Sequence, residues 1–449
     1  MASNGKSAVP GGQAGRANRV EAEPYPAAES LPFLTGDLPG VGGQVKRRLE
    51  DFRVEEIPLP AFGVAGVPPA SGAGKMPATP TPAGGQCLHV RLTKAGISTP
   101  VAITRLGRFL DIPLSAIGHA GMKDALAVTA QTISLENVDR RRLAAFHDSQ
   151  MQLEVLGLGP RLRPGDLAGN RFDLRIRGVA PDAVNLAESV LAVIRRRGLP
   201  AYFGPQRFGS RQDNVELGLA LLGGELQEFV KIYLGRARPG DQPEEKAARD
   251  AFDAGFLDRA LQLWPRRCQQ QRRVLMAYRQ AHRRAGPAIS AVDKTARRLY
   301  ISSVQSRIFN QLLARRIDTL DRFLPGDIGL DQQGRLFPVH RPQEHQAAAE
   351  AFRASPTGPM VGYVAGLADA QAGIIERQAI DPYALDLAAF GRFGAKGTRR
   401  PLRFCLTDLR VGEGDDGFGR FLAVHFDAPP GCYATILLRE IMKAEIAGE

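Results

Sequence analysis

A helix-patterned, arginine-rich middle segment separates two strand-patterned parts of the chain. Before it, residues 172–176 alternate strictly between apolar and charged side chains, as in a half-buried strand. After it, residues 402–411 and 420–427 have the pattern of a strand pair around the turn GEGDDG. The middle, residues 240–298, opens with DQPEEKAARD and continues with PRRCQQQRRVLMAYRQAHRR. This order predicts an α+β fold in which a separate helical insertion interrupts the strands.

The rest of the chain supplies further strands and helices. Runs of β-branched or alternating residues predict three strands, at residues 45–59, 88–93 and 128–135. We expect the first two to pair with each other. Thr99 and Pro100 supply an N-cap and a first-turn proline for a helix over residues 100–110. Apolar side chains three or four residues apart predict three more helices, over residues 181–197, 300–316 and 434–445.

Two segments are rich in small residues and proline. Residues 1–31 carry no periodic apolar pattern, so we predict a disordered tail there. Residues 60–86 are rich in Pro, Gly and Ala and have little to bury, which predicts a flexible insertion between two strands.

The sequence lacks the signatures of several common protein classes. No stretch approaches the roughly 20 consecutive apolar residues that a membrane span needs, and residues 1–31 lack the apolar core of a secretory signal. We therefore expect a cytoplasmic protein without membrane contact. The four cysteines are too scattered for a CxxC pair, so we expect neither a metal site nor a disulfide framework. There is also no P-loop, no GxSxG elbow and no GxGxxG after a strand.

The charge balance is basic. The 449 residues include 59 Lys and Arg against 47 Asp and Glu, a formal net charge of +12. An excess of this size suits a polyanionic partner, because neutralised phosphates release condensed counterions. A merely basic protein from an arginine-rich proteome would have the same balance. The charge alone favours the two interpretations equally.

The segment AGMKDA places Asp124 in a glycine-assisted loop beside Lys123 and just before a predicted strand. A carboxylate next to a cation stays ionised at neutral pH, as a nucleophile or a base must. The alternative is an ordinary Lys–Asp pair in a solvated turn.

Three further segments combine polar and aromatic or basic residues. Asn170 and Phe172 lie two apart at the start of a strand and so share one face, where an amide could orient a carboxylate and a ring could stack on a nucleobase. A core position for Phe172 is the alternative. The loop LPAYFGPQRFG, residues 199–209, suits stacking and hydrogen bonding, but resembles a glycine-cornered core loop equally. The arginines in 266–284 suit either a phosphate track or a solvated helix surface.

Taken in order, these motifs resemble the tRNA pseudouridine synthase D (TruD) family. The resemblance rests on five segments: AGMKDALAVTAQTIS, RLRPGDLAGNRF, YFGPQRFG, SVQSRIFNQLLARR and ATILLRE. The opening KRRLEDFRVEE and the segment KAGIST agree with it. The similarity runs from about residue 45 to 443, with breaks at 60–86 and in much of the middle domain.

The resemblance implies a fold and its boundaries. It implies a pseudouridine synthase-like catalytic domain with a mixed, largely antiparallel sheet, interrupted by an inserted α/β TRUD domain that forms the other wall of an RNA cleft. The catalytic domain would comprise residues 32–209 and 400–449. The inserted domain would comprise residues 210–399, in agreement with the change in composition noted above.

The resemblance also implies an activity. Members of the family are isomerases that convert uridine to pseudouridine in RNA, chiefly uridine 13 in the D arm of tRNA, without cofactor or metal. By resemblance Asp124 is the catalytic aspartate, Asn170 the amide that positions it, Phe172 the ring that stacks on the target uracil, and Lys46 a basic residue near the site. We expect a monomer that binds tRNA. Asp124 would act as a nucleophile at C1′ or as a base at the ribose, and the sequence supports both.

Three features depart from the family pattern. Gly85-Gln86-Cys87 replaces a frequent Gly-Glu-His, Ala201 stands where Asn is expected, and the 60–86 insertion is foreign to compact members. None falls on the four site residues, so we expect activity to be retained.

Two other functions remain as alternatives. A catalytically silent RNA-binding or tRNA-folding protein is supported only by the altered Gly85-Gln86-Cys87, and a pure binder has no need of Asp124 beside phosphates. An enzyme for a small anionic metabolite is disfavoured, because aromatic-plus-arginine motifs are spread over several segments.

Overall fold

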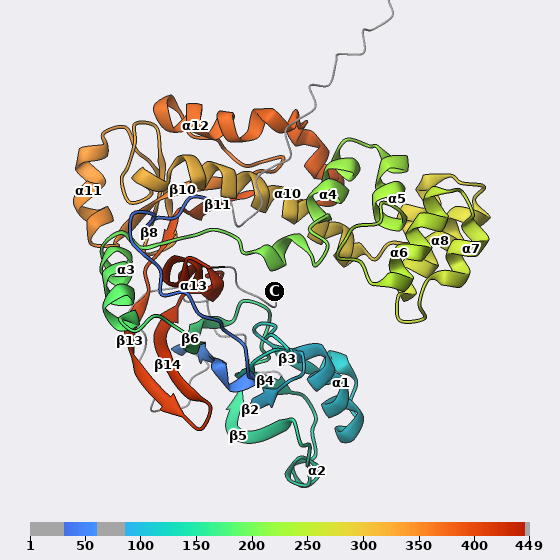
Figure 1. Cartoon of the computed structure of the whole chain (residues 1–449), viewed down its shortest axis with the longest axis horizontal. Helices are drawn as coiled ribbons and strands as arrows, with labels where there is room; N and C mark the ends of the chain where they lie inside the picture. Colours follow the sequence, from blue (N-terminus) through green and yellow to red (C-terminus); the bar gives the residue numbers. More distant parts are fainter. Residues whose placement is uncertain (1–30, 61–85, 445–449) are drawn as a thin grey trace, which may run out of the picture.

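The computed structural model describes residues 31–60 and 86–444 (Figure 1). The predicted tail at 1–31 and the predicted insertion at 60–86 lie outside the described residues apart from their end positions.

The main sheet has the order β13-β14-β6-β1-β4-β2-β5, with β3 beside β4. Within the described residues its only parallel pair is β1 with β4, so the sheet is mixed and largely antiparallel, as predicted. The strands are β1 Phe52–Pro58, β2 Cys87–Ala95, β3 Ile117–His119, β4 Val128–Leu135, β5 Met151–Gly159, β6 Leu167–Arg177, β13 Thr407–Asp416 and β14 Gly419–Ala428.

The expected pairing of the first two strands is wrong. β4 lies between β1 and β2, and Val54 of β1 faces Thr129 of β4 on one side and Phe172 of β6 on the other. Phe52 and Val54 are both buried, so β1 is stabilised as a central strand rather than as one arm of a hairpin. The long connection from Pro58 to Cys87 does not impose the hairpin that a short turn would.

The predicted turn GEGDDG is also wrong in extent. β13 continues to Asp416, and the turn falls on Gly417 and Phe418. Asp416 accepts from Arg177 at 2.7 and 3.0 Å and from Arg175 at 2.8 Å. Arginines from the neighbouring β6 thus stabilise an acidic strand end that its composition alone would make a loop.

Three helices cover the main sheet: α1 Thr99–Leu110, α3 Ala183–Arg197 and α13 Ala434–Met442. Leu106 of α1 packs with Leu92 and Ile133 of the sheet, all fully buried. The predicted N-cap of α1 is one residue off, because Ser98 occupies that position and Thr99 is already helical. The Thr99 hydroxyl is engaged elsewhere, as described below.

The middle of the chain adds a second sheet with its own helices. This sheet is antiparallel with the order β11-β10-β8-β9. Its strands are β8 Ile328–Asp331, β9 Leu336–Pro338, β10 Ala354–Met360 and β11 Thr398–Pro401, and the helices around it are α10 Lys294–Arg315, α11 Pro342–Glu350 and α12 Ala370–Ile380. A short antiparallel pair, β7 Leu199–Pro200 with β12 Arg403–Phe404, brings together two chain segments about two hundred residues apart.

A lobe of short helices extends to one side of α10 (Figure 1). It consists of α4 Asn214–Leu222, α5 Leu226–Leu234, α6 Pro243–Asp253, α7 Leu257–Leu263, α8 Gln269–Gln280 and α9 Ala285–Ala291. Arg272 of α8 donates at 2.7 Å to two carbonyl oxygens at the end of α7, and Arg267 pairs with acidic side chains of α6. Part of the predicted arginine cluster therefore ties these helices together.

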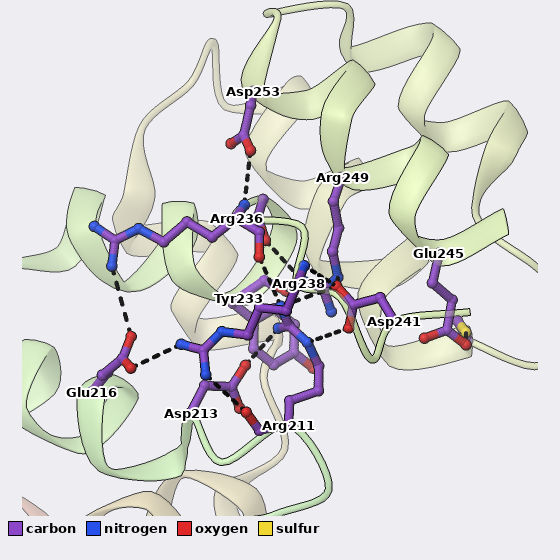
Figure 2. A network of polar contacts seen from close by, with 12 residues as sticks. Arg211, Asp213, Glu216, Tyr233, Arg236, Arg238, Asp241, Glu245, Arg249 and Asp253 are labelled. Carbon is purple, nitrogen blue, oxygen red and sulfur yellow. Dashed lines mark hydrogen bonds and ion pairs between the residues drawn. The ribbon is translucent and has the colours of Figure 1, made fainter. Parts of the chain in front are cut away.

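An ion-pair network lies where the chain enters this lobe (Figure 2). Arg211 donates to Asp241 at 2.7 Å and to Asp213 at 2.5 Å, and the buried Arg249 donates to two carbonyls at the end of α5. Burial alone would raise the pKa of Asp241, but hydrogen bonds from Arg238 and Arg211 lower it below its usual value. Asp241 therefore stays ionised at the root of the lobe, whereas burial raises the pKa of Asp213 in the same network.

Candidate active site

Asp124 lies in the loop between β3 and β4, with a half-exposed side chain (39%). The backbone of this loop rests on Lys94, the last inward-facing residue of β2. Its ammonium donates to the carbonyl oxygens of Ile97 at 2.6 Å, Asp124 at 2.8 Å and Lys123 at 3.3 Å. A buried cation thus fixes the backbone directly beneath the exposed carboxylate.

Burial lowers the pKa of Lys94 to about 8, against the opposing attraction of Asp124. The ammonium therefore begins to lose its third proton, and with it one donor and its charge, only slightly above neutral pH.

A second set of hydrogen bonds holds the start of the loop. The Lys123 N–H donates to the Thr99 hydroxyl at 2.9 Å, and that hydroxyl donates to Gln131 at 2.8 Å. The Gln131 amide donates to the Gly121 carbonyl at 3.0 Å. Thr99 at the start of α1 and Gln131 on β4 thus clamp the loop from both sides.

Lys46 faces Asp124 from the segment before β1. Its Nζ lies 4.0 Å from Asp124 Oδ2 and 4.6 Å from the centre of the Phe52 ring. The Lys46 backbone is left-handed, with φ of 57° in a non-glycine residue, a conformation that surrounding contacts must maintain. Gln206 approaches the other carboxylate oxygen, with Nε2 3.4 Å from Oδ1. The structure therefore brings two of the predicted site residues, Lys46 and Asp124, together.

Asn170 joins the site through Lys123. The Lys123 ammonium donates to Asn170 Oδ1 at 2.6 Å and lies 3.3 Å from Glu56 Oε2. Glu56 is directly opposite Asn170 across the β1–β6 pair, which sets both partners of the lysine on one sheet face. Burial raises the pKa of Glu56, while Lys123 and the Thr132 N–H oppose that shift. Asn170, the amide predicted to position Asp124, is thus hydrogen-bonded to Lys123, the residue before Asp124.

Phe172 packs in an aromatic group below these charges. Its ring stacks on Phe426, with centroids 4.8 Å apart and planes 17° from parallel, and meets the edge of Phe52 at 6.4 Å. Only 7% of Phe172 is exposed. In the structure the ring is a core residue on the same sheet face as Asn170.

The loop at 199–209 links the site to the inserted helices. Phe203 N–H donates to Asn310 of α10 at 2.8 Å, and the Asn310 amide returns a bond to the Phe203 carbonyl at 2.9 Å. Arg207 donates to Ser306 of the same helix at 3.1 Å. Because Gln206 of this loop reaches Asp124, α10 helps to set one wall of the site.

The chain is similar to known proteins over most of its length. The family model for tRNA pseudouridine synthase D (TruD) matches residues 30–441. The chain belongs to the TruD family. It is 35% identical to a tRNA pseudouridine synthase D of Geobacter metallireducens, over 92% of this chain and 97% of the relative, and 34% identical to one of Geotalea daltonii, over 92% and 100%. A crystal structure of the same family name from Methanosarcina mazei superimposes with a TM-score of 0.74 at 27% identity, covering 92% of this chain and 96% of that one.

Lys94 and Glu56 of this TruD member lie in the segments KAGIST and KRRLEDFRVEE, but the sequence analysis predicted neither as a site residue. A signal for both is present in the strand alternation. Lys94 continues the inward row of Val90 and Leu92 in β2, and Glu56 continues the inward row of β1. A charge at an inward position must be paired, so each predicts a polar partner inside the fold.

Within residues 31–60 and 86–444, no group of three or more His, Cys, Asp or Glu side chains is placed to hold a metal ion. In the same ranges no helix is long and apolar enough to cross a membrane. What the site does offer is one accessible carboxylate on a fixed loop, with Lys46 facing it and Lys123 and Lys94 beside and beneath it. Such a carboxylate is accessible to a reacting group.

Proposed function

We propose that this protein isomerises uridine to pseudouridine in tRNA, with uridine 13 of the D arm as its target and Asp124 as the catalytic group. Membership of the TruD family supports the reaction and its tRNA substrate. One observation supports a catalytic role for Asp124: its carboxylate is accessible, while Lys94 and Thr99 hold the backbone of its loop in place by hydrogen bonds.

The reaction needs a reacting group but no external oxidant or reductant. The bond between C1′ and N1 breaks, the uracil turns, and a bond forms between C1′ and C5, whose proton then leaves while N1 gains one. An ionised Asp124 can attack C1′ as a nucleophile or remove a proton from the ribose as a base. In both roles Asp124 reacts as the carboxylate, which lies 4.0 Å from the Lys46 ammonium.

The other site residues have supporting roles in this proposal. Asn170 accepts a hydrogen bond from the Lys123 ammonium and so helps to fix the peptide bond between Lys123 and Asp124. Phe172, which is 7% exposed and stacked on Phe426, would stack on the target uracil once RNA binding uncovers its ring. Lys46 places a positive charge 4.0 Å from Asp124, where the phosphates of a polyanion approach.

The test is a modification assay with the purified protein and an unmodified tRNA transcript. We expect one pseudouridine, at position 13, mapped by sequencing after chemical labelling. A matched transcript with cytidine at position 13 should gain none. Tight tRNA binding without any pseudouridine would support the silent RNA-binding alternative instead, and pseudouridine only at another position would refute the choice of target.

A further inference from the structure

Two large apolar side chains project into solvent on either side of Asp124. Met122, two residues before it, is 74% exposed, and Leu126, two residues after it, is 55% exposed. Single exposed apolar residues are common on protein surfaces. Here, however, both flank the one accessible carboxylate of a site otherwise lined by lysines and amides.

The exposure of these side chains does not come from a loose loop. Two hydrogen bonds hold the backbone around Met122. The Gly121 carbonyl accepts from the Gln131 amide, and the Lys123 N–H donates to the Thr99 hydroxyl. Around Leu126, the Asp124 carbonyl accepts from Lys94 at 2.8 Å, and the Ala127 carbonyl accepts from Gly96 at 3.4 Å. Ala127 itself is fully buried. A backbone anchored on both sides of each residue presents the two apolar side chains in fixed positions.

The chemistry of the two side chains suits the faces of nucleobases. Methionine has a polarizable thioether that makes favourable contacts with aromatic rings, and leucine offers only apolar surface. Proteins that open nucleic acid stacks insert apolar side chains of this kind between bases. A target nucleotide that turns out of its helix leaves such a gap behind.

We propose that Met122 and Leu126 enter the base stack of the RNA on either side of Asp124 and fill the space that the target uridine leaves when it turns into the site. This inference rests on the proposed function, because it takes the partner to be the tRNA around the target uridine. The two residues thus help to open the stack, while Asp124 carries out the reaction.

The test separates opening of the stack from chemistry. The probe is a tRNA transcript with 2-aminopurine on the 3′ side of uridine 13, whose fluorescence rises when its neighbour leaves the stack. With the Asp124→Asn protein, which retains Met122 and Leu126, we expect a clear rise on binding. Adding Met122→Ala and Leu126→Ala to that protein should reduce the rise to less than about half, because alanine cannot hold the gap.

Activity is then measured with Asp124 intact. The variant with both alanines should form pseudouridine about tenfold more slowly or worse, while Met122→Leu with Leu126→Met, which keeps apolar surface, should retain most of the rate. The matched controls are Leu158→Ala on β5, where Leu158 is 56% exposed, and Met276→Ala on α8, where the side chain is also exposed. Neither control should change the rate or the fluorescence.

The outcomes distinguish the two proposals. A double-alanine variant with the full rate and the full fluorescence rise would overturn this inference and leave the proposed function standing. If the unaltered protein forms no pseudouridine, the proposed function fails, and the fluorescence rise still decides whether the two side chains open the stack. Because all four alanine positions are exposed, unfolding midpoints should stay near that of the unaltered chain, which confirms that the variants fold.

Discussion

Replacing Lys94 by Met should disable the site while leaving the fold largely intact. Methionine keeps the length of the buried side chain but removes the ammonium that donates to the carbonyls of Ile97, Lys123 and Asp124. The loop that carries Asp124 would lose its support from below. A misplacement of about 1 Å at a reacting group can lower a rate by about a hundredfold, and we expect a loss of that order.

The magnitudes limit how far the free energy of unfolding can change. Two short hydrogen bonds are lost, and each buried carbonyl left without a partner costs about 1–3 kcal/mol. In the other direction, burial is the largest cause that lowers the pKa of Lys94 from 10.5 to about 8 against the attraction of Asp124, which at about 1.4 kcal/mol per pH unit is a net cost of about 3 kcal/mol for the charged form in the folded chain. The two effects oppose each other, so the free energy of unfolding should change by no more than about 3 kcal/mol.

The pH dependence gives this prediction a second readout. Because the pKa of Lys94 is lower in the folded chain than in the unfolded chain, its contribution to the free energy of unfolding is constant below about pH 8 and rises as the pH increases towards 10.5. Activity should instead fall above pH 8, because the Lys94 ammonium loses a proton and with it one hydrogen-bond donor and its charge.

The assay is release of tritium from the C5 position of labelled uridine in single-turnover reactions between pH 6.5 and 9.5, beside urea unfolding at the same pH values. In the Lys94→Met variant the rate should decline less above pH 8, because the amine that titrates there is absent. A variant with the rate and pH profile of the unaltered protein would refute the positioning role of Lys94.

Three further predictions concern packing and electrostatics. Phe172→Ala should lower the free energy of unfolding by about 3–5 kcal/mol in urea, because it removes a ring stacked on Phe426; a loss under about 1 kcal/mol would mean that the ring does not pack the core. Lys123→Met should destabilise by about 3–5 kcal/mol by leaving Glu56 buried and unpaired, and adding Glu56→Gln should recover most of that loss; no recovery in the double variant would contradict the pairing. Arg272→Ala should destabilise by about 1–3 kcal/mol without changing the salt dependence of tRNA affinity, whereas a shallower dependence would place Arg272 on the RNA.

The sequence predicted well those elements whose pattern is local. The strand over 128–135 coincides with β4, because a run of β-branched residues needs no distant partner to be recognised. The helix over 100–110 was right within one residue, but its N-cap was not. Thr99 has the chemistry of a cap, yet its hydroxyl is engaged by Lys123 and Gln131 from other parts of the chain.

Pairing across long distances could not be predicted. The composition of GEGDDG predicted a turn, but most of the segment is a strand. Arginines of β6, more than two hundred residues earlier, bind Asp416 and stabilise it. In the same way, the motif around Asp124 predicted a carboxylate beside a lysine, but not that Lys123 turns away from it to Asn170 and Glu56. That arrangement depends on the register of β1 against β6, which only the folded sheet fixes.

The central claim is that Asp124 carries the reaction, and Asp124→Asn tests it most directly. The change removes the charge and keeps the volume, and Lys94 contacts only the backbone oxygen of this residue. We predict no pseudouridine in tRNA incubated with the variant, with tRNA affinity within about tenfold of the unaltered protein, because binding does not need the carboxylate. Measurable turnover by a variant free of contaminating unaltered protein would contradict the claim.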